Sequence, residues 1–330
     1  MTLSTPSIKP TNGAKYLVLA PMEGLADWPM RQLLTEQAGF DWTVSEFIRV
    51  TDQLLPKRVF YRSCPELQHP TKTPIRLQLL GSQPDAMAAN AERALELGSY
   101  GLDLNFGCPS KTVNNSCGGA MLLKSPQSIE EIITAVRRSV PSNQVLSAKV
   151  RLGFYSINEI HDILSAVING GANQVVIHAR TKEQGYRPPA FWWKIRELTK
   201  PINVIVNGEI WNSHDYWQAL SQSHCQHAML GRGVISDPDL IHKIRAMQLG
   251  QSFKPRSWLQ MCQDLEQFVF LSRERMPEKY IAGRLKQWLK HLGRHWPEAR
   301  ACLERIRTLT QADSILEQAK EMDIQQDHSL

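Results

Sequence analysis

The chain has 330 residues, enough for one large domain or two ordinary ones. Its 42% hydrophobic and 21% charged residues exclude a disordered or fibrous protein, and it has no run of about 18 apolar residues, so we expect no membrane-spanning helix. The net charge of +6 permits a nucleic-acid partner without requiring one.

Residues 1–15 lack an apolar signal-peptide core, and we interpret them as a flexible leader. Over residues 16–249, short β-rich runs alternate with helical stretches. The predicted strands are 16–20, 42–46, 75–80, 101–105, 145–152, 174–178, 202–206 and 227–230; the helical stretches include 85–97, 126–139, 157–169 and 214–222. This alternation predicts an α/β fold, a (βα)8 TIM barrel. A doubly wound sheet is the alternative, but no G-x-G-x-x-G turn follows the first strand.

From residue 250 onwards the pattern becomes helical, over 258–271, 279–292 and 297–309. It predicts a small C-terminal all-α domain over 250–312, followed by an acidic tail over 313–330. Residues 254–307 hold 12 Lys and Arg against 6 Asp and Glu, so positive charge is concentrated there. Within 279–292, the spacing of Lys279, Lys286 and Lys290, continued by Arg294, gives one basic stripe, which suits a phosphate backbone or a solvated surface.

Barrel enzymes carry their chemistry at the C-terminal ends of the strands. The segment Pro21-Met22 ends the first strand, and polar residues and glycines follow or end the strands: Glu23, Glu46, Gln78, Asn105, Lys149, Arg151, His178, Arg180, Asn207, Gly208, Glu209, Gly231 and Arg232. Lys149 interrupts an apolar strand, so it must face a ligand or a buried carboxylate. The last two strand ends suit the phosphate site of this architecture, with Arg232 as a charged donor.

Six cysteines occur, and none forms a CxxC pair, which favours a reducing cytoplasm over disulfides or a zinc site. We expect no bound metal, since the His224–His227 segment enters the barrel at the wrong face. Cys108 lies between Gly and Pro at a strand end, where its protonated thiol could act as an acid. A small buried hydrophobe is the other interpretation. Cys117, in a Gly-rich loop, is the rival acid, and spacing does not decide between the two.

Six motifs occur in order: APMEG at 20–24, NFGCPS at 105–110, KVR at 149–151, HART at 178–181, NGE at 207–209 and GRG at 231–233. Over residues 16–312 the chain resembles the tRNA-dihydrouridine synthase family. EFIRV at 46–50, TKEQGY at 181–186 and RLKQWL at 284–289 are similar to its bacterial C-type branch, whose members modify uridine 16 of tRNA. The chain departs from relatives at 115–117, where they often have glycines.

The resemblance implies an FMN-binding catalytic barrel over 16–249 and a tRNA-binding helical domain over 250–312, with NADPH as reductant. Cys108 would protonate C5 of a uracil, and Lys149 would stabilise the reduced flavin. The residues implied to line FMN are Pro21, Met22, Glu23, Gln78, Lys149, His178, Asn207, Gly208, Glu209, Gly231 and Arg232. Those implied to contact tRNA are Arg49, Asn105, Arg180, Tyr186, Lys279, Arg284, Lys286 and Lys290. We expect a monomer.

Three alternatives stay open. An FMN-dependent barrel oxidoreductase acting on a small molecule, such as a dihydroorotate dehydrogenase or enoate reductase type, shares the phosphate site but has no use for a basic helical domain. A non-catalytic RNA-binding protein on an inactive barrel conflicts with the intact set of Cys108, Lys149, His178 and Arg232. A Schiff-base aldolase using Lys149 leaves Cys108 unexplained.

Overall fold

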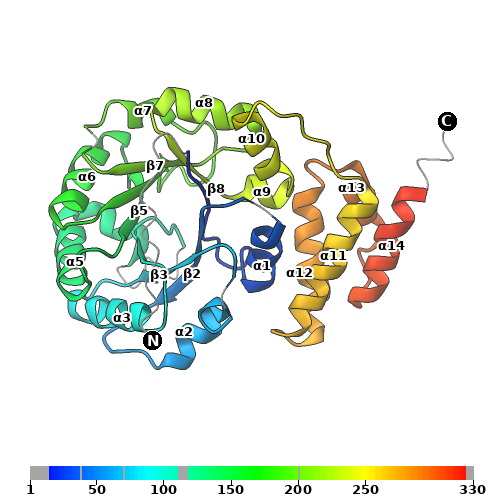
Figure 1. The fold of residues 1–330 in the computed structure, drawn as a ribbon, viewed down its shortest axis with the longest axis horizontal. Helices are drawn as coiled ribbons and strands as arrows, with labels where there is room; N and C mark the ends of the chain where they lie inside the picture. The colour runs from blue at the N-terminus through cyan, green and yellow to red at the C-terminus, as the bar shows by residue number, and fades with distance from the viewer. Residues whose placement is uncertain (1–14, 38, 70, 111–117, 200, 325–330) are drawn as a thin grey trace. The chain divides into compact units, whose positions relative to one another are not determined.

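Eight parallel strands close into a barrel in chain order, with β8 pairing with β1 (Figure 1). The computed structural model of the protein describes residues 15–37, 39–69, 71–110, 118–199 and 201–324. The strands are β1 (Leu17–Leu19), β2 (Trp42–Arg49), β3 (Ile75–Leu80), β4 (Leu102–Asn105), β5 (Leu146–Gly153), β6 (Gln174–Thr181), β7 (Asn203–Asn207) and β8 (His227–Leu230). The predicted (βα)8 barrel is confirmed, and with it the rejection of a doubly wound sheet.

Amphipathic helices return the chain from each strand to the next. Those after β2 to β7 are α2 (Lys57–Ser63), α3 (Pro84–Glu96), α5 (Pro126–Ser139), α6 (Ile160–Asn169), α7 (Trp192–Arg196) and α8 (Ser213–Ser223), with 3-10 helices at Pro65–Leu67, Gly119–Lys124 and Ile157–Glu159. In α5, Ile129, Ile132, Ile133 and Val136 are buried, at the spacing that puts them on one helix face. Figure 1 shows α3, α5 and α6 side by side around the strands.

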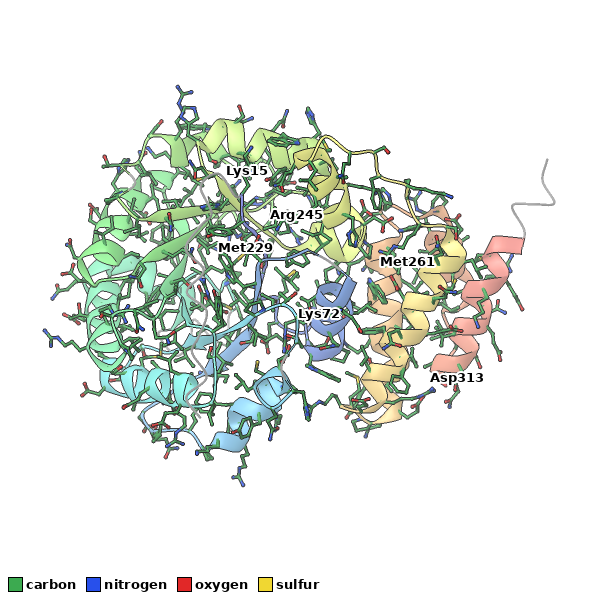
Figure 2. All side chains as sticks on the ribbon, in the orientation of Figure 1. Lys15, Lys72, Met229, Arg245, Met261 and Asp313 are labelled. Carbon is green, nitrogen blue, oxygen red and sulfur yellow. The ribbon has the colours of Figure 1, made fainter. Side chains whose placement is uncertain are left out.

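The barrel interior changes character along its axis. Its apolar core includes Val18, Val176, Ile205 and Met229, the last labelled inside the barrel in Figure 2. Below this core, the guanidinium of Arg76 stacks 4.2 Å from the Trp42 ring centroid and donates to Gln174. Toward the C-terminal strand ends the interior becomes polar, and these side chains form the site described below.

The chain divides into two compact units. The second unit contains residues 29–39, 210–213 and 232–330, and the functional boundary after residue 249 stays a prediction. The helices of this second unit are α1 (Trp28–Gln37), α9 (Arg232–Ser236), α10 (Leu240–Gln248), α11 (Trp258–Arg273), α12 (Glu278–Leu292), α13 (Pro297–Arg305) and α14 (Ala312–Ile324). The indole of Trp288 on α12 donates to the Ile235 carbonyl on α9 at 3.1 Å, which ties the C-terminal helices to the helix after β8.

The described part of the predicted acidic tail lies in the helix α14. Ile315, Ala319 and Met322 recur at helical spacing and are buried, while Asp313, Glu317 and Glu321 are exposed. The Ala319 carbonyl accepts the indole N–H of Trp258 at 2.7 Å, which fastens α14 to α11. Of the predicted leader, only Lys15 falls among the described residues. Within that described part, no helix is long and apolar enough to cross a membrane.

Candidate active site

The loop after β4 holds Cys108 in a fixed position. The Asn105 side-chain oxygen accepts the backbone N–H groups of Gly107 at 3.0 Å and Cys108 at 2.9 Å, while the Asn105 amide donates to Gln78 at 2.8 Å. The thiol is only partly exposed, and this burial raises its pKa, with a smaller contribution from Glu23. Cys108 is therefore protonated at neutral pH and suited to donate a proton.

A buried carboxylate that we did not predict supports this loop from inside the barrel. Asp103 on β4 accepts hydrogen bonds from the Gln78 amide at 2.7 Å and from the Ser147 hydroxyl at 2.5 Å. Burial raises its pKa, although these hydrogen bonds and the charges of Lys149 and Arg76 oppose the rise. The only signal in the sequence was one acidic residue inside an apolar strand, the same signal that singled out Lys149.

Lys149 points toward the next strands of the barrel. Its ammonium donates to the side-chain oxygen of Asn207 at 3.1 Å, and the Asn207 amide donates to the Met229 carbonyl on β8 at 2.9 Å. Removal from water and the neighbouring Arg151 lower the pKa of Lys149 to about 8, while Asp103 acts in the opposite direction. A cation that is poorly stabilised in this way favours the arrival of an anionic group.

The ends of β6 and β7 meet at a glycine. Gly208 has φ 105°, and a Cβ there would overlap the His178 ring, lying 2.8 Å from its Nε2. No other residue fits without displacing the imidazole. The Gly208 carbonyl accepts the indole N–H of Trp192 at 2.8 Å, which fixes the turn from outside.

Arg180, for which a contact to tRNA stays a prediction, is engaged by other residues of the barrel mouth. Its side chain is fully buried, forms an ion pair with Glu209 and donates to the Arg187 carbonyl at 2.9 Å. It therefore presents no surface to tRNA in this structure and instead holds two loops together. Glu209, at φ 61°, directs its carboxylate to this pair.

A carboxylate joins the loop after β1 to β2. The Glu46 side chain accepts the Gly24 N–H at 2.6 Å, and β2 continues beyond Glu46, where we expected it to end, to Arg49. Pro21 and Met22 are half-buried, the carboxyl of Glu23 has its pKa raised by partial removal from water, and Arg49 is exposed. Pro21, Met22 and Glu23 follow β1 and Arg49 ends β2, so they lie at the C-terminal strand ends.

Gly231 directly follows β8 and lies near Met22, since a Cβ on it would lie 3.6 Å from the Met22 sulfur. Arg232 is the next residue in the chain and begins α9. The two residues belong to different units, so the predicted joint role of Gly231 and Arg232 at a phosphate stays a prediction.

Arg151 joins the loop after β4 to the end of β6 and the loop that follows it, a role that we did not assign to it. Its guanidinium donates to the carbonyls of Gly107 at 2.8 Å, Thr181 at 3.2 Å and Gly185 at 2.9 Å. It also lies 5.3 Å from the ring centroid of Tyr186, a residue that is 53% exposed. The spacing of the sequence placed Arg151 on the correct strand but could not show which carbonyls it reaches.

The basic residues of α12 fall into two groups. Lys279 and Lys290 are exposed, whereas Arg284 and Lys286 are half-buried. Lys286 donates to the Arg307 carbonyl at 3.0 Å, and Arg284 donates to Gln287. The predicted stripe is thus partly engaged within its own unit. Its last member, Arg294, lies beyond the helix end, with its guanidinium 4.0 Å from the Trp211 ring centroid.

No group of three or more His, Cys, Asp or Glu side chains placed to hold a metal occurs in the described ranges. Cys117, the rival acid, and its neighbours Asn115 and Ser116 lie outside those ranges.

A closed barrel of eight parallel strands, with a thiol, an amine and an imidazole at its C-terminal mouth, defines a barrel enzyme. The sequence model of the family described as dihydrouridine synthase matches residues 18–326. The chain belongs to the dihydrouridine synthase family. This assignment confirms the resemblance carried by the six motifs and the expected flavin-dependent oxidoreductase.

Similar proteins agree with this assignment. A tRNA-dihydrouridine(16) synthase of Haemophilus influenzae is 43% identical over 306 residues, covering 91% of this chain and 97% of the relative. One of Pseudomonas syringae pv. tomato is 44% identical, covering 91% and 96%. The solved old yellow enzyme from Trypanosoma cruzi is 11% identical with a TM-score of 0.50, covering 73% of this chain and 90% of that one, which reflects the shared barrel fold.

Proposed function

We propose that this protein reduces the C5–C6 double bond of a uridine in tRNA to give 5,6-dihydrouridine, in the cytoplasm. We further propose FMN as the flavin, NADPH as the reductant and uridine 16 as the target. The proposal for the position is supported by relatives of 43% and 44% identity that are tRNA-dihydrouridine(16) synthases, and by the three C-type segments of the sequence.

The barrel mouth fits a flavin. Gln78, Lys149 and His178 offer an amide, an ammonium and an imidazole around it, and Gly208 leaves open the space that a Cβ would fill. When bound and reduced, FMN supplies the hydride that C6 of the uracil receives. Lys149 would hold the negative charge of the flavin, since its depressed pKa gives it a reason to bind an anion.

The observation that carries the proposal is the partly buried thiol of Cys108, whose loop Asn105 holds at the end of β4. Hydride addition at C6 leaves negative charge at C5, which must take up a proton. Cys108 holds that proton, because burial raises the pKa of its thiol, and Asn105 fixes its backbone. Water then returns a proton to the thiolate at neutral pH, so the residue is restored for the next turnover.

The target uridine must leave its stack to reach the barrel mouth, at a cost of a few kcal/mol. Contacts to the rest of the tRNA would offset this cost. Exposed Arg49 and Tyr186 at the mouth, and exposed Lys279 and Lys290 on α12, supply cations and an aromatic face for them.

The test is to express the gene in a host that lacks its own synthases and to map dihydrouridine in the tRNA, alongside the absorbance of the purified protein. We expect a yellow protein and dihydrouridine at position 16. Dihydrouridine at another position would keep the activity and overturn the proposed target. A yellow protein that forms none would instead favour a small-molecule flavin reductase. A colourless protein that still binds tRNA would favour the inactive-barrel alternative.

A further inference from the structure

The loop after β5 presents one aromatic ring to solvent on a rigid support. Tyr155 is 64% exposed, whereas its neighbour Phe154 is only 4% exposed and packs edge-on against it, with ring centroids 4.6 Å apart. An exposed tyrosine next to a buried aromatic ring offers a flat stacking face that does not collapse into the protein.

Glu159 holds this loop through the backbone. Its carboxylate accepts the N–H groups of Phe154 at 2.6 Å, Tyr155 at 3.3 Å and Ser156 at 2.9 Å. A Cβ at Gly153 would overlap the Ser156 carbonyl, so the turn is as tight as a chain allows. The position of Tyr155 therefore depends on backbone contacts, and its side chain is not needed to hold the loop.

Two lysines lie over these rings. The Lys124 ammonium lies 4.0 Å from the Phe154 centroid and 4.9 Å from the Tyr155 centroid, and the Lys182 ammonium lies 4.6 Å from that of Phe154. Lys182 also pairs with Glu183 at 2.9 Å. In this arrangement a lysine can contact a phosphate of a nucleic acid, while the exposed tyrosine ring next to it can stack on a base.

This platform, made of Lys124, Phe154, Tyr155 and Lys182, belongs to the same ring of loops as Cys108. The N–H groups of Lys182 and Glu183 donate to the carbonyls of Gly153 at 2.9 Å and Phe154 at 3.1 Å. On the other side, the Ala120 N–H, in the 3-10 helix that ends at Lys124, donates to the Cys108 carbonyl at 3.0 Å.

We propose that the platform binds one unpaired nucleotide that flanks the target uridine. Its base stacks on Tyr155, and Lys124 contacts its phosphate. This inference rests on the proposed action on tRNA and names a contact that holds the strand once the uridine has left its stack. Stacking is tolerant of sequence, so the platform contributes affinity without selecting a base.

The test measures the Kd of the flavin-loaded enzyme for unmodified tRNA, both intact and with an abasic site on either side of the target. We expect Tyr155→Ala to weaken binding of intact tRNA by roughly 5- to 100-fold, the range for loss of one base–aromatic stack. Tyr155→Phe keeps the ring and should bind within about twofold of the wild type. Removing the stacked base should cost the wild type the same factor and cost Tyr155→Ala nothing.

The lysine is tested through salt. Lys124→Gln should lower the slope of log affinity against log salt by about 0.7 to 0.9, the value for one phosphate contact. Lys72→Gln is the matched control, since Lys72 is exposed but precedes β3, at the opposite end of the strands from the platform. Its slope should equal that of the wild type.

Unchanged affinity in Tyr155→Ala, or equal losses on intact and abasic tRNA, would overturn the platform while an active wild type keeps the proposed function. If the wild type is inactive but Tyr155→Ala still weakens binding of intact tRNA and not of abasic tRNA, the platform is kept and the proposed function is overturned. Flavin content and thermal midpoint, measured for each variant, separate a lost contact from a misfolded loop.

Discussion

The chemistry of Cys108 depends on a side chain three residues earlier. The side-chain oxygen of Asn105 accepts two backbone N–H groups of the loop, and its amide donates to Gln78. Asn105, on β4, therefore fixes the position of Cys108 in the loop. The thiol is then kept protonated by burial. At this scale the sequence revealed the residue types, but the identity of their partners required the fold.

Replacing Cys108 with Ala should leave flavin binding intact and lower the rate of dihydrouridine formation by about 10²- to 10⁴-fold, the contribution of a positioned acid. The measurement is single-turnover formation of dihydrouridine in tRNA with the pre-reduced enzyme. Cys117→Ala is the control and should keep the wild-type rate. Full activity of Cys108→Ala, or a loss confined to Cys117→Ala, would reassign the proton donor.

The pKa of Lys149 predicts how the affinity for FMN depends on pH. Its pKa of about 8 in the flavin-free protein lies below the usual value for lysine, and an anionic ligand binds the protonated amine better. FMN affinity should therefore be constant at lower pH and fall as the pH rises through 8, approaching tenfold per pH unit. Titration of the flavin-free protein with FMN between about pH 6.5 and 9 measures this slope.

Lys149→Gln removes the titrating group, so its affinity should be lower at neutral pH and flat over the same range. An equal slope in the variant and the wild type would show that another group controls the dependence. Arg151, Asp103 and Cys108 are the charged or titratable neighbours that influence Lys149.

Gly208 and Gly231 form a matched pair for a test of packing. Gly208→Ala would drive a Cβ into the His178 ring at a positive φ, whereas a Cβ at Gly231 meets only the Met22 sulfur at 3.6 Å and Ala20 at 3.8 Å. We expect Gly208→Ala to lower the free energy of unfolding of the flavin-free protein by about 1–3 kcal/mol. Gly231→Ala should change the free energy of unfolding little. Unfolding by denaturant measures both variants, and equal losses of stability would refute the steric argument.

Single elements show where sequence patterns succeed. The bounds of β3, β8 and α5 coincide with the prediction, because β3 and β8 are short runs rich in apolar residues and α5 is a 3.6-period run. β2 runs three residues further than predicted, because its register with β3 shifts between Val44 and Phe47. Such an irregularity depends on the neighbouring strand and leaves no local signal.

The exposed lysines of α12 predict how tRNA affinity depends on salt concentration. Lys279 and Lys290 are exposed, and each is free of the intramolecular carbonyl contact that Lys286 makes with Arg307. The double variant Lys279→Gln, Lys290→Gln should weaken tRNA binding and lower its salt slope by about 0.7 to 1.8, for one or two phosphate contacts.

Lys320→Gln is the control for this variant, because Lys320 is half exposed on α14 and pairs with Glu266. Its salt slope should match the wild type. A slope that changes equally in both would mean that overall charge, and not the α12 surface, governs tRNA affinity.

Over the whole molecule, sequence reasoning found the barrel and its mouth but not the ties between loops. Arg151 joins the loop after β4 to the end of β6, and the buried Asp103 accepts hydrogen bonds from Gln78 on β3 and Ser147 on β5; both roles arise from closure of the barrel. The acidic composition after residue 312 concealed Ile315 and Met322, whose burial makes α14 part of the second unit. The overall composition of a helix does not show whether its few apolar residues share one face.

The division of the chain into two units predicts that truncation after residue 249 lowers the stability of the remaining protein. A cut after residue 249 follows the composition change but passes through the second unit. It would remove Trp288, whose indole bonds to Ile235 on α9, and Arg256, which pairs with both Asp239 before α10 and Asp264 on α11. Asp239 is 2% exposed, so it would lose its charge partner and part of its cover together.

We therefore expect residues 1–249 alone to be less stable than the full chain, by at least about 3 kcal/mol, the cost of leaving one such charge without its partner. Thermal unfolding and FMN titration of the two proteins test this expectation. The variant Trp288→Phe in the full chain, which keeps the ring but loses one hydrogen bond, should cost only about 1–3 kcal/mol. A truncated protein with the full-length midpoint and FMN affinity would mean that the barrel is complete without α11 to α14, and that the boundary near 249 is real.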